Sequence, residues 1–214
     1  MPGPIPPDPE LRRYIEENII PRYRSFDKGH GEDHARTVIA NAMELAAGYD
    51  VDPDMVYCAA ACHDIGLAEG REFHHLSSGR MIRENRHLRQ WFDEDQIETI
   101  AQAAEDHRAS GKGEPRSIYG RITAEADRDI DPMKIIRRTV QFSLSHYPGL
   151  SKEEHRERFM QHLDEKYAEG GYLKLWIPES KNASRLQELR CVIKDKSRLD
   201  RLFDDIFREE TGSL

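Results

Sequence analysis

Apolar residues recur along most of the chain at spacings of three and four, the period of an α-helix. In residues 93–107, for example, Ile97, Ile100, Ala104 and His107 fall on one helical face, so we expect the His107 side chain to point inward. No stretch alternates apolar and polar residues as a half-buried strand would. The sequence therefore predicts an all-α protein. Helices are expected over about residues 9–20, 32–47, 52–66, 74–85, 93–107, 115–130, 132–146, 151–169 and 178–209.

Capping residues mark several of these predicted boundaries. Asp8-Pro9 and Asp52-Pro53 each combine an N-cap carboxylate with proline at the first helical position. Gly66 follows the last periodic residue of its helix, as a terminating glycine often does. At 214 residues the chain is long enough for a single domain, residues 1–214, with a substantial core.

The composition limits the classes of partner. A net charge of −8 argues against binding to a nucleic-acid polymer, because phosphate attraction needs a basic surface. No apolar run approaches the roughly 18–20 residues of a membrane span, so no membrane partner is expected. The N-terminal residues lack the pattern of a signal peptide, and three cysteines give no disulfide framework. These features favour a cytoplasmic location.

The most informative residues are His63 and Asp64, an imidazole and a carboxylate at the end of a small-residue helix. His34 and Asp127 lie on two other predicted helices, one on each side of this pair in the sequence. Two imidazoles and two carboxylates suit a divalent ion such as Mn²⁺ or Fe²⁺, with positions left open for water. A closed structural zinc site fits less well, because such sites usually use thiolates.

The order of these residues, H…HD…D over helices, resembles the HD-domain metal-dependent phosphohydrolase superfamily. Within it, the chain is similar to the small stand-alone bacterial HD hydrolases, which share an Asp-x-x-His element, here Asp27 to His30, and a Glu-Ala-Asp element, here ending at Asp127. The resemblance implies a helical HD bundle over about residues 22–148 and a C-terminal helical extension over about 149–214. It also implies that the metal ligands are His34, His63, Asp64 and Asp127.

Two further histidines have several interpretations. His75 lies in a His-x-x-x-Gly element similar to one in the HD-GYP branch, where the histidine helps to hold a second metal, and His107 falls near that branch's histidine pair. Three roles are open for His75 and His107: contact with a phosphate group, binding of a second ion, or a structural role. The number of metal ions at the site is accordingly one or two. His74 is expected to be the exposed neighbour of His75, although the order of the two could be reversed.

Basic and polar side chains near these histidines are candidate substrate contacts. The candidates are Lys28, His30, His75, Arg108 and Lys112. If the helices converge, these side chains are natural partners for phosphate oxygens. The alternative is a solvated surface, which is the usual role of such residues.

The resemblance implies hydrolysis of a phosphoester or phosphoanhydride by a metal-activated water. Asp64 would be both ligand and proton acceptor, and His107 or His75 would stabilise charge or assist the leaving group. The expected partner is a small phosphorylated substrate, and a nucleotide is the best candidate. The C-terminal helical extension is also compatible with a homo-oligomer. Two alternatives remain open: a diiron HD-type oxygenase, and a non-catalytic regulatory HD domain that binds a nucleotide.

Overall fold

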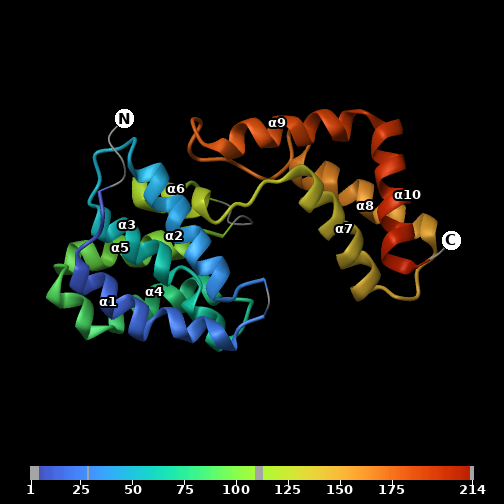
Figure 1. Cartoon of the computed structure of the whole chain (residues 1–214). Coiled ribbons are helices and arrows are strands. Elements are labelled where there is room, and N and C mark those ends of the chain that lie inside the picture. Colours follow the sequence, from blue (N-terminus) through green and yellow to red (C-terminus); the bar gives the residue numbers. More distant parts are fainter. Residues whose placement is uncertain (1–4, 28, 109–112, 213–214) are drawn as a thin grey trace. The chain divides into compact units, whose positions relative to one another are not determined.

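The computed structural model of the protein describes residues 5–27, 29–108 and 113–212 (Figure 1). The chain forms two compact units, Met1–Arg128 and Asp129–Leu214. Every regular element among the described residues is an α-helix or a short 3₁₀-helix, which confirms the all-α prediction.

The first unit is a helical bundle in which α5 contacts α3, α4 and α6, and α2 contacts α3 and α6. The helix α4 also packs closely on the 3₁₀-helix η2. The elements of this unit are α1 (Pro9–Asn18), η1 (Ile20–Ser25), α2 (Glu32–Ala46), α3 (Pro53–Cys62), η2 (Ile65–Glu69), α4 (His74–Glu84), η3 (Arg86–Gln90), α5 (Glu94–Asp106) and α6 (Ile118–Ala126).

The central helix α3 is buried from Met55 to Cys62. Its alanines, Ala59 to Ala61, are fully buried, and such small side chains allow neighbouring helices to approach closely. The helix was expected to continue to Gly66, but it ends at Cys62. Asp64 leaves the helical region with φ −112° and ψ 6°, and η2 follows at once. The His63–Asp64 pair therefore lies at a sharp change of chain direction.

The contact between η2 and α4 depends on Gly66. A Cβ atom at this position would lie 2.1 Å from the carbonyl oxygen of His74 and 2.5 Å from the backbone nitrogen of Ser78. The Gly66 N–H donates to the Ser78 hydroxyl at 2.9 Å, which fixes the contact. Glycine has no Cβ atom, so the first turn of α4 can pack directly against the backbone that follows Asp64.

Two other predicted helices differ in extent from the observed ones. The helix expected over 115–130 is shorter, because α6 begins only after Ser117, whose hydroxyl accepts the Gly120 N–H. The helix expected over 178–209 is two helices, α9 (Lys181–Lys194) and α10 (Lys196–Thr211). Asp195 separates them with φ −82° and ψ 82°, and its side chain caps α10. A break of one residue barely changes the spacing of the flanking apolar residues, so the pattern does not reveal it.

The second unit contains α7 (Pro132–His146), α8 (Lys152–Tyr167), α9 and α10. Its core includes the rings of Phe159 and Phe203, whose centroids lie 5.3 Å apart. The helix α7, which the sequence analysis placed in the HD core ending at about 148, contacts α8, α9 and α10 in this unit. Among the described residues, no helix has the length and apolar character needed to cross a membrane.

Candidate metal centre

Six His and Asp side chains gather in the first unit at the ends of five helices. His34 lies in the first turn of α2, His63 ends α3 and Asp64 follows it, His74 begins α4, and His107 and Asp127 are the C-cap residues of α5 and α6. They form two groups, His34–His63–Asp127 and Asp64–His74–His107. Within each group the potential ligand atoms all lie within 4.8 Å of one another, a spacing that one metal ion could span.

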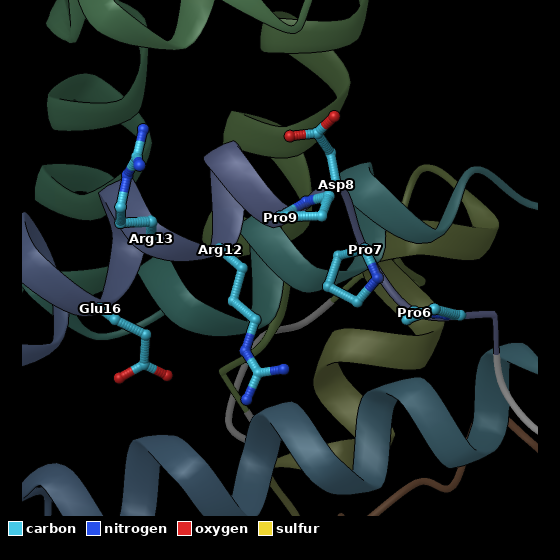
Figure 2. Close-up of a pocket in the computed structure, with 7 residues that line it drawn as sticks. All are labelled: Pro6, Pro7, Asp8, Pro9, Arg12, Arg13 and Glu16. Atoms are coloured by element: carbon cyan, nitrogen blue, oxygen red, sulfur yellow. The ribbon is translucent and has the colours of Figure 1, made fainter.

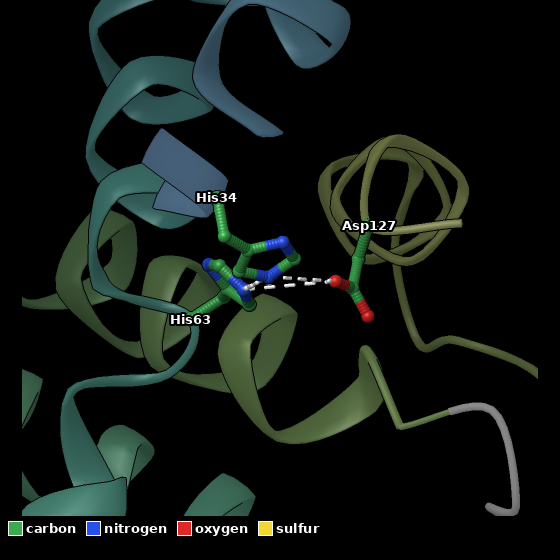
Figure 3. Close-up of side chains that lie close together, drawn as sticks. All are labelled: His34, His63 and Asp127. Atoms are coloured by element: carbon green, nitrogen blue, oxygen red, sulfur yellow. Dashed lines mark hydrogen bonds and ion pairs between the residues drawn. The ribbon is translucent and has the colours of Figure 1, made fainter. Parts of the chain in front are cut away.

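The first group contains two imidazoles and one carboxylate (Figure 3). The Nε2 atoms of His34 and His63 are 3.3 Å apart. Oδ1 of Asp127 lies 3.2 Å from Nε2 of His34 and 3.8 Å from Nε2 of His63. In Figure 3 the Asp127 carboxylate points from the end of α6 toward both rings.

The second group has the same composition. The Nε2 atoms of His74 and His107 are 3.3 Å apart. Oδ1 of Asp64 lies 3.3 Å from the first of these atoms and 3.4 Å from the second. All three side chains are largely withdrawn from solvent: 13% of the His74 side chain is exposed, and 3% each of Asp64 and His107.

The Asp64 carboxylate joins the two groups. While its Oδ1 faces His74 and His107, its Oδ2 lies 3.3 Å from Nε2 of His63 and 3.7 Å from Nε2 of His34. A carboxylate placed in this way can bind one cation through each oxygen. The six side chains can therefore be treated as one centre with two adjoining halves.

The hydrogen bonds of the imidazoles decide which ring atoms face the centre. Nδ1 of His63, His74 and His107 lies 2.8, 2.8 and 2.5 Å, respectively, from a backbone carbonyl oxygen three residues earlier. A carbonyl only accepts, so each Nδ1 must carry a hydrogen, and each ring then turns Nε2 toward the centre. Such Nδ1–carbonyl bonds are the usual way in which proteins orient a metal-binding histidine.

This arrangement fits a cation. Lone pairs of the imidazoles and oxygens of the carboxylates converge, and acceptors at 3.3 Å repel one another unless a proton or a metal ion lies between them. Among the described residues, Asp64 Oδ1 is buried and has no hydrogen-bond partner, although a buried carboxylate oxygen normally has one. Imidazole and carboxylate together suit Mn²⁺, Fe²⁺ and related ions.

The electrostatics of the centre favour positive charge. Burial alone would lower the pKa of His63, but the carboxylates of Asp64 and Asp127 outweigh it and raise this pKa to about 9. Burial would raise the pKa of Asp127, whereas the hydrogen bond from His34 and the charge of His63 bring it down to about 2. The pKa of Asp64 is lowered far below its usual range by His63 and His107, against the effect of burial. Both carboxylates are therefore ionised at neutral pH.

One further histidine, His30, lies beside the first group. His30 is edge-on to His34, with ring centroids 5.7 Å apart. Nδ1 of His30 contacts both oxygens of Asp27 at 2.9 and 3.1 Å. Asp27 also accepts the Gly29 N–H at 2.8 Å, and Arg71 lies 3.5 Å away. The carboxylate thus fixes the His30 ring through Nδ1 and leaves its Nε2 available.

The remaining predicted contacts lie around the start of α4. Arg108 donates to the backbone carbonyl of Glu72 at 2.8 Å. Burial lowers the pKa of both His74 and His75, and the positive charge of Arg108 lowers both further. Lys28 and Lys112, also expected as substrate contacts, lie outside the described residues.

The sequence favoured His75 as the inner histidine and left the reverse order of His74 and His75 open. In the structure His74 stands beside Asp64 and His107, and His75 belongs to neither group. The first residue of a helix shows little periodicity from which to infer its direction. Gly66 is the sequence feature that bears on this choice, because it allows the backbone after Asp64 to contact the first turn of α4 closely.

A shallow pocket of about 500 Å³ lies elsewhere, at the start of α1 (Figure 2). It is lined by residues 6–9, Arg12, Arg13 and Glu16. None of these residues belongs to either group of metal-binding candidates. The pocket therefore shares no residue with the metal centre, and none of its lining residues is a histidine.

Comparison with known protein families matches a segment that contains all six residues of the centre. Residues 31–130 match the model of the HD domain family, so this segment of the chain is similar to that family. The match ends close to the boundary of the first compact unit at Arg128. The HD domain and its His and Asp clusters together support a metal-dependent hydrolase in general terms.

Among solved structures, the chain is similar to one titled a predicted HD superfamily hydrolase, from an uncultured Thermotogales bacterium. The two are 24% identical, with a TM-score of 0.48, and the alignment covers 72% of this chain and 84% of that chain. No curated protein matches the sequence.

Proposed function

We propose that the protein is a phosphohydrolase that uses two divalent cations to cleave a phosphoester or phosphoanhydride bond of a small substrate. The observation that carries this proposal is the position of Asp64, whose two carboxylate oxygens face two separate histidine pairs. His34, His63, Asp64 and Asp127 would hold one cation. Asp64, His74 and His107 would hold the other.

When bound, such cations would supply Lewis acidity: they lower the pKa of a water molecule and neutralise charge on a phosphate oxygen. The protein's part is to fix the ligands. The carbonyls that accept from Nδ1 of His63, His74 and His107 hold the three rings in one tautomer and orientation. His107 is then a ligand, and a different residue must donate a proton to the leaving group.

His30 is suited to that proton transfer. Its Nδ1 lies 2.9 Å from Oδ1 of Asp27, which orients the ring, and its Nε2 is directed away from the carboxylate. The ring lies beside His34, and 25% of its side chain is exposed, so a substrate at the centre could reach it. In this mechanism the protonated His30 donates from Nε2 to the departing oxygen.

The start of α4 offers contacts for a phosphorylated ligand. Arg108 and Arg71 supply guanidinium groups, which pair well with phosphate oxygens. Phe73, which directly precedes His74, is 59% exposed although it is aromatic. We propose a nucleotide as the substrate, with its phosphate at the cations and its base against Phe73.

The test is an assay of metal-stripped protein, with and without Mn²⁺, against a panel of nucleoside mono-, di- and triphosphates. Release of phosphate or pyrophosphate should require the metal and should be lost in Asp64→Asn. The matched control is Asp33→Asn, which alters an exposed carboxylate beside His34. Turnover that survives Asp64→Asn, or that is lost equally in both variants, would contradict the proposal.

The same six side chains also favour a second candidate function, the diiron oxygenase. Four histidines and two aspartates around a shared carboxylate provide the six ligands that this alternative requires. Iron retained in a ratio of two per chain, with an optical absorption band and no turnover of any nucleotide, would support the oxygenase over the hydrolase.

A further inference from the structure

Tyr23 lies in η1 and is fully buried directly behind the His63–Asp64 turn. Its hydroxyl donates to the carbonyl oxygen of Ala61 at 2.9 Å and lies 3.3 Å from the Asp64 backbone nitrogen, whose N–H it accepts. One side chain, distant in sequence, therefore binds the backbone on both sides of His63.

The Ala61 carbonyl and the Asp64 N–H lie at the end of α3, where the regular hydrogen bonds of the helix stop. Because α3 ends at Cys62, the carbonyl of Ala61 and the N–H of Asp64 have no regular helical partners. A buried backbone group without a hydrogen bond is costly, so the Tyr23 hydroxyl stabilises this particular turn over other conformations. The Asp64 backbone keeps its φ of −112° and ψ of 6° under this restraint.

The Tyr23 ring restrains the neighbouring imidazole as well. Its centroid lies 6.3 Å from that of His63, at an interplanar angle of 35°. On another edge it meets Phe26 at 5.3 Å in a T-shaped contact. The ring is thus held between Phe26 and His63, and the hydroxyl cannot move away from the turn without disturbing both.

We infer that Tyr23 is a positioning residue for the metal centre, holding the Asp64 carboxylate in the orientation that serves both cations. The inference rests on the proposed function, because it assumes that the centre binds metal. Asp64 uses both of its oxygens, so a rotation of its backbone would misplace ligands in both halves of the centre at once. Tyr23 itself touches neither the substrate nor a cation in this account.

The test compares Tyr23→Phe with Tyr14→Phe in the full-length, metal-stripped protein. Tyr14 is a matched control, because its hydroxyl also donates one bond and accepts one, both with Asn85, at 3.0 and 2.9 Å. Mn²⁺ affinity is measured by isothermal titration, and the melting temperature of each metal-free variant is measured alongside. Loss of an outer hydrogen bond that orients a ligand typically weakens metal binding by about 10–100-fold.

We expect Tyr23→Phe to weaken Mn²⁺ binding by at least about 10-fold, while Tyr14→Phe leaves the affinity unchanged. A purely structural role would lower the melting temperature of both variants and the Mn²⁺ affinity of neither, and this result would overturn the inference. If the wild-type protein binds no Mn²⁺, Fe²⁺ or Zn²⁺, the metal centre itself fails, and the inference fails with it.

If Tyr23→Phe does not fold, hydrogen exchange of the Asp64 amide in the metal-free wild-type protein provides the test. An amide bonded to the Tyr23 hydroxyl should exchange as slowly as the buried amides of α3. Exchange at the rate of an unstructured peptide would show that this bond does not hold the turn.

Discussion

At the scale of single residues, the centre depends on hydrogen bonds that fix the direction of each ligand. His63, His74 and His107 each bind a carbonyl through Nδ1, and His30 binds a carboxylate in the same way. The direction in which Nε2 points separates their proposed roles. Nε2 of His74 and His107 faces Asp64, and Nε2 of His63 faces His34, whereas His30 belongs to neither group of metal-binding candidates.

This separation predicts a leaving-group dependence for His30. His30→Ala should lower kcat on a nucleotide substrate by about 10²–10⁴-fold, the usual contribution of a general acid. The loss should be much smaller on p-nitrophenyl phosphate, whose leaving group departs without a proton. His146→Ala, at an exposed position of α7, is the control. Equal losses on both substrates would show that His30 does not donate the proton.

At the scale of elements, the contact of η2 with α4 decides whether His74 reaches the centre. Gly66→Ala would place a Cβ against the backbone of His74 and Ser78, which cannot move aside as a flexible side chain could. We expect a loss of about 1–3 kcal/mol in the free energy of unfolding, typical of overpacking, and a weaker second cation site. Chemical denaturation and metal titration measure the two effects.

Gly149→Ala is the control for this prediction, because a Cβ at Gly149 would meet nothing within 4 Å. Its stability and metal binding should be those of the wild-type protein. A Gly66→Ala variant that is as stable as Gly149→Ala and binds the same number of ions would contradict the role given to this contact.

The helices α4 and α5 are also joined by Arg83, whose Nε and Nη2 donate to Glu98 at 2.7 and 2.9 Å. These bonds lower the pKa of Glu98 from 4.5 to about 2. A carboxylate with a lowered pKa stabilises the fold above its unfolded pKa, and this stabilisation is lost as the pH falls through the folded pKa. The contribution should be complete at pH 7 and disappear between about pH 4.5 and 2.

Glu98→Gln should therefore lower the free energy of unfolding at pH 7, by less than about 1 kcal/mol because 46% of the Glu98 side chain is exposed. The difference from wild type should shrink toward zero near pH 2. Denaturation over this pH range measures it, with Glu17→Gln on an exposed face of α1 as the control. A difference that stays constant with pH would rule out this ion pair as its source.

The helices follow from local patterns, and the sequence singled out five of the six residues of the centre, all except His74. Apolar spacing indicated the helices, and the inward direction of His107 is confirmed by its 3% exposure. The choice between His74 and His75 could not be predicted, because it depends on how α4 packs on η2. The hydrogen bond of Tyr23 to the carbonyl of Ala61, at the end of α3, could not be predicted either, because Tyr23 lies far away in the sequence and no periodic pattern links it to the turn.

At the scale of the whole molecule, all six residues of the centre belong to the first compact unit, Met1–Arg128. The second unit has its own core, in which Phe203 is fully buried and contacts Phe159 and Phe207. Metal binding should therefore be a property of the first unit, whereas the packing of the second unit has its own stability.

Phe203→Ala tests this division. Truncation of a buried phenylalanine typically costs about 3–5 kcal/mol, so the second unit should unfold at lower temperature or denaturant concentration. Calorimetry would record this change, and Mn²⁺ affinity measured below that transition should equal that of the wild-type protein. A matching loss of affinity while the second unit is still folded would show that the two units are coupled.

The most direct test of the central claim is the number of metal ions bound per chain. Metal-stripped wild-type protein, His74→Ala and His75→Ala would be loaded with Mn²⁺, desalted and analysed by elemental mass spectrometry. The centre described here predicts two ions for the wild type, one for His74→Ala and two for His75→Ala, because only His74 lies beside Asp64 and His107. A single ion in all three proteins, or the same loss in both variants, would contradict a two-cation centre bridged by Asp64.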